Sequence, residues 1–176
     1  MAAAVALAVT GCGSDEGGRA RAALRPELDP AARRAQLGRA LELVSVKPSA
    51  LGYRVRLEPR RNPGLRAQVD TKTRTITLFL ARGDAPHRTA HDLAHELGHA
   101  WDNEHMTDAG RRAYLVRRHG RTRRWFPTAN RASDYQVGAG DFAEVYALCH
   151  AASPEYRSRV APRPANACAV LPKGAR

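Results

Sequence analysis

The segment 95–99, which reads HELGH, constrains the fold of this chain more than any other feature of the sequence. Apolar residues around it recur with the period of a helix over about residues 87–104, so His95 and His99 lie one turn apart on one face. Two imidazoles from one face can occupy two corners of a zinc tetrahedron. Glu96 then lies beside the metal without binding it, where it can accept a proton from zinc-bound water.

Other side chains of this helix are weaker candidates for the site. His91 precedes His95 by four residues, and we expect it to support the site or begin the helix rather than to bind metal. Asp102 either holds a ligand histidine through its second nitrogen or faces solvent. His105 follows His99 by six residues, as a third metzincin ligand does, but Asp102 replaces the glycine of that pattern.

The remaining patterns predict an α+β fold. Gly98 allows a neighbouring backbone to approach the central helix closely. The expected helices cover about 30–46, 87–104, 107–118 and 141–152, the first capped by Asp29-Pro30 and the third by Thr107-Asp108. The expected strands cover 53–58, 67–70 and 75–80, the last two joined by a polar turn.

The third protein ligand is the open question, because catalytic zinc usually has three and keeps one position free. The segment 140–147, GDFAEVYA, offers Asp141 and Glu144 on one face of a helix that follows two glycines. Either carboxylate is a candidate ligand. The alternative is that they form a capping box, with Asp141 at the N-cap and Glu144 at N3, and that neither binds metal.

Taken together, these motifs resemble the zincin metallopeptidases of the gluzincin type, in particular the compact group whose catalytic domain is like that of anthrax lethal factor. The residues that carry the resemblance are segments 95–100 and 142–144 with Asp102. It implies a minimal zincin-like domain, with a small mixed or antiparallel sheet on the HExxH helix and further helices. It also implies Zn²⁺ and hydrolysis of peptide or protein substrates.

The resemblance departs at one position. In many gluzincins the ligand glutamate is followed three and four residues later by Ala and an acid. Aligned on Ala143-Glu144, that ligand position falls on Gly140, which has no side chain. Gly140 therefore supports an alternative function, a non-catalytic zincin-fold lipoprotein that binds a partner or the cell wall.

Two further roles are implied by the resemblance. Tyr135, just before the ligand helix, is the candidate donor to the substrate oxyanion, the alternative being a tyrosine that only packs. The strand at 75–80 corresponds to the exposed edge that pairs with an extended peptide in zincins.

The positive net charge of the chain does not by itself indicate a protein that binds nucleic acid. Lys and Arg number 29 against 17 acidic residues, giving a net charge of +12. The arginines are scattered and not interleaved with aromatic residues that would stack on bases. We therefore expect a solvated basic surface and no nucleic-acid partner, the alternative being contact with anionic lipid or a cell-wall polymer. We also expect a monomer.

The N-terminus indicates the compartment. Residues 1–11 contain a short apolar run ending in Val9-Thr10-Gly11, and with Cys12 they resemble a bacterial lipoprotein signal peptide. The resemblance implies membrane attachment through lipid on Cys12, outside the cytoplasm. Residues 12–28 then form a flexible tether and 29–176 the zincin-like domain. The alternative is an apolar start with an incidental cysteine.

The other two cysteines fit an exported chain. Cys149 and Cys168 are an even pair, and disulfides persist outside the cytoplasm. A bond between them would attach the C-terminal segment to the last long helix, whereas the alternative is two free thiols.

Overall fold

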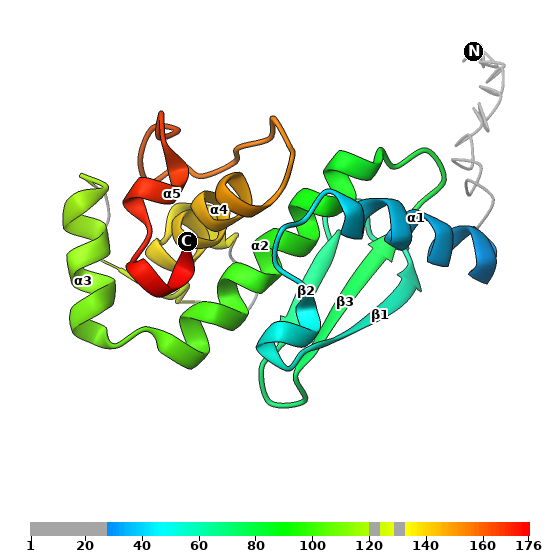
Figure 1. Ribbon diagram of the computed structural model, residues 1–176, viewed down its shortest axis with the longest axis horizontal. Coiled ribbons are helices and arrows are strands. Elements are labelled where there is room, and N and C mark those ends of the chain that lie inside the picture. The colour runs from blue at the N-terminus through cyan, green and yellow to red at the C-terminus, as the bar shows by residue number, and fades with distance from the viewer. Residues whose placement is uncertain (1–27, 120–123, 129–132) are drawn as a thin grey trace, which may run out of the picture.

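The computed structural model describes residues 28–119, 124–128 and 133–176 (Figure 1). The signal-peptide segment 1–11, Cys12 and nearly all of the tether lie outside the described residues. The helices are α1 (Pro30–Glu42), α2 (Pro86–His105), α3 (Asp108–Arg117), α4 (Gly138–His150) and α5 (Ala167–Val170). Short 3-10 helices are η1 (Pro48–Leu51), η2 (Asp134–Gln136) and η3 (Lys173–Ala175), and the strands are β1 (Arg54–Pro59), β2 (Ala67–Asp70) and β3 (Thr75–Leu80).

Helix α2 divides the molecule. The sheet and α1 lie on one side of it, and α3, α4 and α5 lie on the other (Figure 1). This is the α+β fold that the sequence patterns predict. Because α2 is covered from both sides, the buried residues run along it from Thr89 to Asp102. Within the described part of the chain, no helix combines the length and apolar character needed to cross a bilayer.

The sheet has the order β1-β3-β2, with β1 parallel and β2 antiparallel to β3. The strand at 75–80 is therefore central, and the expectation that it forms an exposed edge is wrong. It is buried on both faces: Ile76, Leu78 and Leu80 on one face are at most 3% exposed, and Thr75 and Thr77 on the other are 8% and 3% exposed. The two edges are β1 and the strand at 67–70, β2.

Helix α1 begins as expected and ends early. Asp29 caps it by accepting a hydrogen bond from the Ala32 N–H at 2.8 Å. The helix stops at Glu42, four residues before the predicted end, because Val44 pairs with Ala151 in an isolated antiparallel bridge. A tertiary contact thus overrides the local helical pattern.

Helix α4 begins at Gly138, three residues before the predicted start. The N–H groups of Gly138 and Ala139 donate to the carbonyls of Arg124 and Trp125, both at 2.9 Å. Main-chain carbonyls therefore satisfy the first-turn donors that a capping side chain would satisfy. The capping-box alternative for Asp141 is wrong, since Val137 is the N-cap.

Helices α2 and α4 pack against each other without an intervening side chain at Gly98. A Cβ built at Gly98 would lie 2.8 Å from the Cα of Ala143 and 3.0 Å from the Cβ of Tyr146. The close approach expected at Gly98 is confirmed. On the far side of this contact, Phe142 stacks on Trp101 and meets Tyr114 edge to face.

The segment after α4, residues 151–166, runs back past η2, and we call it the strap. At its two ends lie Cys149 and Cys168, which form a disulfide, as predicted from their even number. Between these ends the Arg157 N–H donates to Glu144, and the Arg159 N–H donates to the Tyr135 carbonyl at 2.8 Å. The strap is thus fixed to both α4 and η2.

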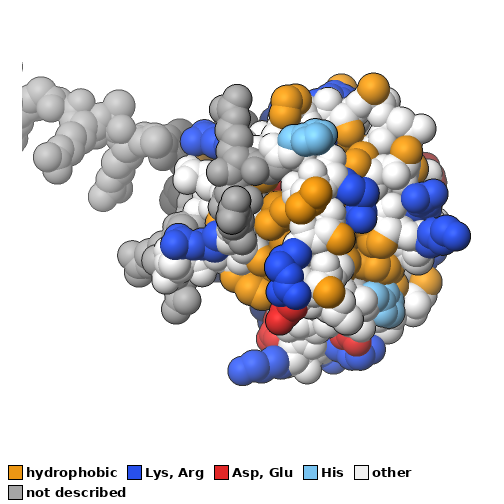
Figure 2. All heavy atoms as spheres, turned by 90° about the vertical axis from the view of Figure 1, so that its left-hand side faces the viewer, with side chains coloured by type: hydrophobic (Ala, Val, Ile, Leu, Met, Phe, Trp, Pro, Cys, Tyr) orange, Lys and Arg blue, Asp and Glu red, His pale blue; other side chains and the backbone are white. Residues whose placement is uncertain are grey.

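Lys and Arg side chains lie apart from one another on the face that carries α3 (Figure 2). Arg112 and Arg117 are exposed on that helix, and Val116 beside them is 74% exposed. On this face the positive charge is interspersed with apolar atoms, in line with the scattered arginines of the sequence.

Substituting Gly98 with Ala should destabilise the fold despite the better helix propensity of alanine. We expect a loss of about 1–3 kcal/mol, because the added methyl group would overlap the α4 backbone. Gly38→Ala is the matched control in α1, where a Cβ meets nothing within 4 Å, and it should gain roughly 0.5–1 kcal/mol. Urea unfolding measures both, and a stabilising Gly98→Ala would contradict the packing argument.

Candidate metal centre

One face of α2 forms the floor of a cleft. Asp92, His95, Glu96 and His99 are spaced three, four and seven residues from the first, so they share that face. All four line a cleft of about 670 Å³. Residues from the segment 62–69, including the edge strand β2, line it on the side of the sheet; the other lining residues are Ser133, Asp134, Tyr135 and Arg157.

Three side chains converge above this floor in a pattern that fits a metal ion. The Nε2 atoms of His95 and His99 lie 3.2 Å apart, and Oδ2 of Asp134 lies 3.1 Å from the first and 2.8 Å from the second. A zinc ion about 2.0–2.1 Å from each ligand of a tetrahedron separates the ligand atoms by about 3.3 Å. The two histidines and the aspartate thus form a candidate metal triad.

Asp134 is the ligand candidate that the sequence analysis missed. It lies in η2, next to Tyr135, and comes from neither of the segments that carry the motif. A Cβ at Gly140 would lie only 2.2 Å from the Asp134 carbonyl oxygen. Gly140 is therefore the place where the main chain of Asp134 rests on α4. In the sequence, a glycine at the expected ligand position was the one sign that another part of the chain packs closely there.

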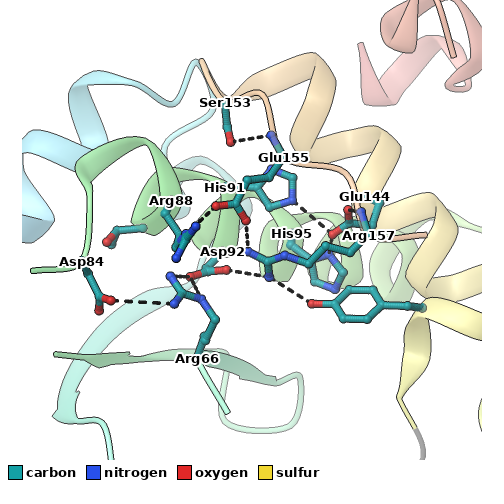
Figure 3. A network of polar contacts seen from close by, with 12 residues as sticks. Arg66, Asp84, Arg88, His91, Asp92, His95, Glu144, Ser153, Glu155 and Arg157 are labelled. Atoms are coloured by element: carbon teal, nitrogen blue, oxygen red, sulfur yellow. Dashed lines mark hydrogen bonds and ion pairs between the residues drawn. The ribbon is translucent and has the colours of Figure 1, made fainter. Parts of the chain in front are cut away.

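Glu144 lies behind the triad and does not join it. Its Oε1 is 2.9 Å from Nδ1 of His95 and 3.1 Å from Nε2 of His91. Figure 3 shows Glu144 near the two rings. Its Oε2 accepts the Arg157 N–H. Glu144 thus differs from the expected ligand role: it holds His95 by Nδ1 and leaves Nε2 directed at the metal position, as carboxylates behind metal-binding histidines do.

Asp141 is directed elsewhere, in contrast to its candidate role as ligand. Its carboxylate is fully buried and accepts hydrogen bonds from Arg118 at 2.9 and 3.1 Å. Tyr114 and Tyr156 donate to it at 2.8 and 3.1 Å. These donors come from α3 and the strap, so Asp141 joins those segments to α4 and is not part of the triad.

The charges of the triad are strongly coupled. Burial raises the pKa of the Asp134 carboxyl, but its hydrogen bonds with His95 and His99 outweigh burial and hold that pKa well below its usual value. Burial lowers the pKa of His95, and Asp134 and Glu144 outweigh it to raise that pKa well above normal. A metal bound by His95 Nε2 requires that nitrogen to be without a proton, so metal and proton would compete for it.

Glu96 lies beside the triad on the cleft floor and is 8% exposed. Burial raises the pKa of its carboxyl above the usual value, and the neighbouring charges of His95 and His99 offset only part of this rise. This environment suits a carboxylate that exchanges protons with a group bound in the cleft.

Tyr135 reaches the same cleft. Its ring packs edge to face on His95, with the ring centroids 5.5 Å apart. Its phenol oxygen accepts a hydrogen bond from Nη1 of Arg157 at 3.1 Å. Because the oxygen is used as an acceptor there, its own O–H remains available to donate to a molecule in the cleft.

The remaining candidates on α2 are resolved by their contacts. His91 is fully buried beside Glu144, in the supporting position that was expected. Asp102 neither contacts a ligand histidine nor faces solvent: it accepts from Arg111 at 2.9 Å and from the Trp125 indole at 2.8 Å. His105 packs on the Trp101 ring and lies outside the triad.

Comparison with known proteins gives no family for the chain: no family model matches it, and no curated protein or solved structure matches it significantly. The function of the chain is therefore inferred from the geometry of the site.

Zinc affinity should identify the third ligand. Asp134→Asn should weaken zinc binding more than about 100-fold, because it removes an anionic ligand. Glu144→Gln should weaken it by about 10–100-fold through the orientation of His95, and the exposed control Asp108→Asn should leave it unchanged. Competition with a chromophoric chelator measures all three. Tight binding by Asp134→Asn together with its loss in Glu144→Gln would assign the ligand to Glu144.

Proposed function

We propose that the chain is a zinc-dependent peptidase of the zincin type, which hydrolyses peptide bonds in the cleft above α2. The observation that carries this proposal is the convergence of three metal-binding side chains and a separate carboxylate, Glu96, in one cleft. The cleft also has the edge strand β2 along its side. A purely structural metal site would need no such base and no such cleft.

His95, His99 and Asp134 are the residues that would hold the metal. Two imidazoles and one carboxylate are a donor set that zinc takes in catalytic sites, and their separations suit a tetrahedron. When bound, zinc supplies Lewis acidity toward a substrate carbonyl and acidifies water. Glu144 keeps the His95 ring oriented for this role from behind.

The protein groups in the cleft divide the proton transfers and the charge stabilisation. Glu96 accepts a proton from the attacking water at its carboxylate and delivers it to the nitrogen of the leaving amine. Tyr135 donates its O–H to the oxyanion that develops on the former carbonyl oxygen, while Arg157 holds the phenol oxygen in place.

The substrate main chain pairs with β2. The side of β2 away from β3 is the sheet edge that borders the cleft, so its N–H and C=O groups can bind an extended peptide. This replaces the strand at 75–80, to which the resemblance assigned the role. Peptide or protein substrates fit such an edge because recognition through the main chain is independent of side-chain identity.

The non-catalytic alternative depended on Gly140 in the expected ligand position. The packing of Asp134 on Gly140 supports the peptidase instead, because the glycine accommodates the loop that brings a third ligand. No contact in the described part of the chain favours a partner-binding role over hydrolysis.

Glu96→Gln should separate metal binding from catalysis. We expect zinc to be retained and hydrolysis of an unfolded protein substrate to fall at least about 100-fold, because the amide cannot accept the proton. Glu58→Gln on β1, an equally conservative change at an exposed carboxylate, should retain full activity. Equal activity of Glu96→Gln would eliminate the mechanism, and zinc binding without any wild-type activity would favour the non-catalytic alternative.

We further propose that Cys12 carries lipid and attaches the domain to the outer side of the bacterial cytoplasmic membrane. The support is the sequence Val9-Thr10-Gly11-Cys12 followed by a Gly- and Ser-containing segment, together with the Cys149–Cys168 disulfide, which suits an oxidising compartment.

Membrane fractionation of bacteria that produce the chain tests this attachment. The wild type should sediment with membranes and be released by detergent, and Cys12→Ser should shift to the soluble fraction because the acyl chains are absent. Cys168→Ser controls for the loss of a cysteine as such and should stay with the membranes. A wild type that fractionates as soluble protein would contradict the lipid anchor.

A further inference from the structure

A network of ion pairs, in which arginines and carboxylates alternate, lies beside the metal triad, and Figure 3 shows most of it. Asp92 on α2 lies at its centre, between Arg66 and Arg157. Arg66 approaches Asp92 from the start of β2, with Nε at 2.8 Å and Nη2 at 2.7 Å from Oδ2. Arg157 approaches from the strap, with Nη1 at 3.0 Å from Oδ1. The two guanidinium groups thus share one carboxylate.

Further ion pairs extend this network beyond Arg66 and beyond Arg157. Asp84 lies 3.7 Å from Arg66 and is held by Arg60. Glu155 pairs with Arg157 and lies 2.6 Å from Arg88. This network of ion pairs therefore contains four arginines, at positions 60, 66, 88 and 157, and three carboxylates, at positions 84, 92 and 155. Its sum is one unbalanced positive charge.

Two of these arginines lie where a ligand in the cleft can reach them. Arg66 and Arg157 are the two arginines of the described segments that line the cleft, and their side chains are 18% and 25% exposed. Asp92 between them is only 5% exposed and gives one carboxylate oxygen to each arginine. The other cleft carboxylates, Glu96 and Asp134, face His95 and His99 instead.

Resting on the proposed peptidase function, we propose that Arg66 and Arg157 form a subsite for a substrate carboxylate. The carboxylate is that of an acidic side chain or of the peptide C-terminus. Guanidinium groups bind carboxylates through paired, charge-assisted hydrogen bonds, and partial burial strengthens them. The buried Asp92 contacts both groups and so holds them next to each other at the cleft.

The position of the subsite sets the position of the carboxylate along the substrate. Asp92 precedes His95 by three residues, which places it about one helical turn, or about 5 Å, along the cleft floor. An extended peptide rises about 3.3 Å per residue. The recognised carboxylate therefore lies one or two residues from the bond that is cut.

Matched peptides test this proposal with the zinc-loaded wild type. One pair differs by Glu against Gln at the first or second residue on either side of the cut, and a second pair by a free against an amidated C-terminus. We expect kcat/KM to be about tenfold higher for the carboxylate in one pair, and the ratio to fall as salt is raised. The pair that responds identifies the source of the carboxylate. Ratios near one in both pairs would overturn the subsite.

Binding to zinc-loaded Glu96→Gln provides a readout that does not depend on turnover. The preferred peptide should again bind about tenfold tighter than its neutral partner, as measured by fluorescence anisotropy. A binding preference in a protein whose wild type cleaves nothing would keep the subsite and reject the peptidase. Cleavage of both partners at equal rates, with equal binding, would keep the peptidase and reject the subsite.

Variants locate the preference. Arg66→Met should bring the ratio toward one, and Arg66→Lys should retain part of it because the charge remains. Arg88→Met removes an arginine of the same ion-pair network that does not line the cleft, and it should leave the ratio unchanged. Zinc content and urea unfolding confirm that each variant is folded. A preference that survives in folded Arg66→Met and Arg157→Met would overturn the assignment.

Discussion

The packing of α4 against α2 is the contact on which the rest of the structure depends. Gly98 lets the two helices approach until Ala143 lies against α2. At that distance Glu144 reaches the Nδ1 atom of His95 from behind. One turn earlier on α4, Gly140 provides the space in which Asp134 enters from the front. Both the orientation of His95 and the third side chain of the triad thus depend on one interhelical distance.

Buried charges determine the arrangement more than they stabilise it. A carboxylate without water is costly unless several donors meet it, and Asp92, Asp102 and Asp141 each have them. Asp141 receives Arg118, Tyr114 and Tyr156, which joins α3 and the strap to α4. Asp92 receives an arginine from each side of the cleft. Such contacts have few alternative geometries, so they fix the walls of the cleft relative to its floor.

The sequence predicts the local features well, because they depend on neighbouring residues. The face that carries His95 and His99 follows from their spacing, and the strand bounds 67–70 and 75–80 agree with those predicted. The order of strands does not follow from such patterns, and the central strand was taken for the edge. Asp134 was missed for the same reason: nothing in its neighbourhood marks a ligand, and only the packing on Gly140 brings it to the histidines. Asp141 and Glu144 lie outside the triad of His95, His99 and Asp134. A helical period shows which residues share a face but not which partner that face meets.

The disulfide has a consequence for the integrity of the chain. Cys149 and Cys168 close a covalent ring that contains the whole strap, and the strap supplies Arg157 to the cleft. A single cut in the backbone between these cysteines leaves the two fragments joined through sulfur, and the non-covalent contacts of the strap still hold each half in place. A domain exposed to peptidases can therefore be nicked at this segment without losing the residues that follow it.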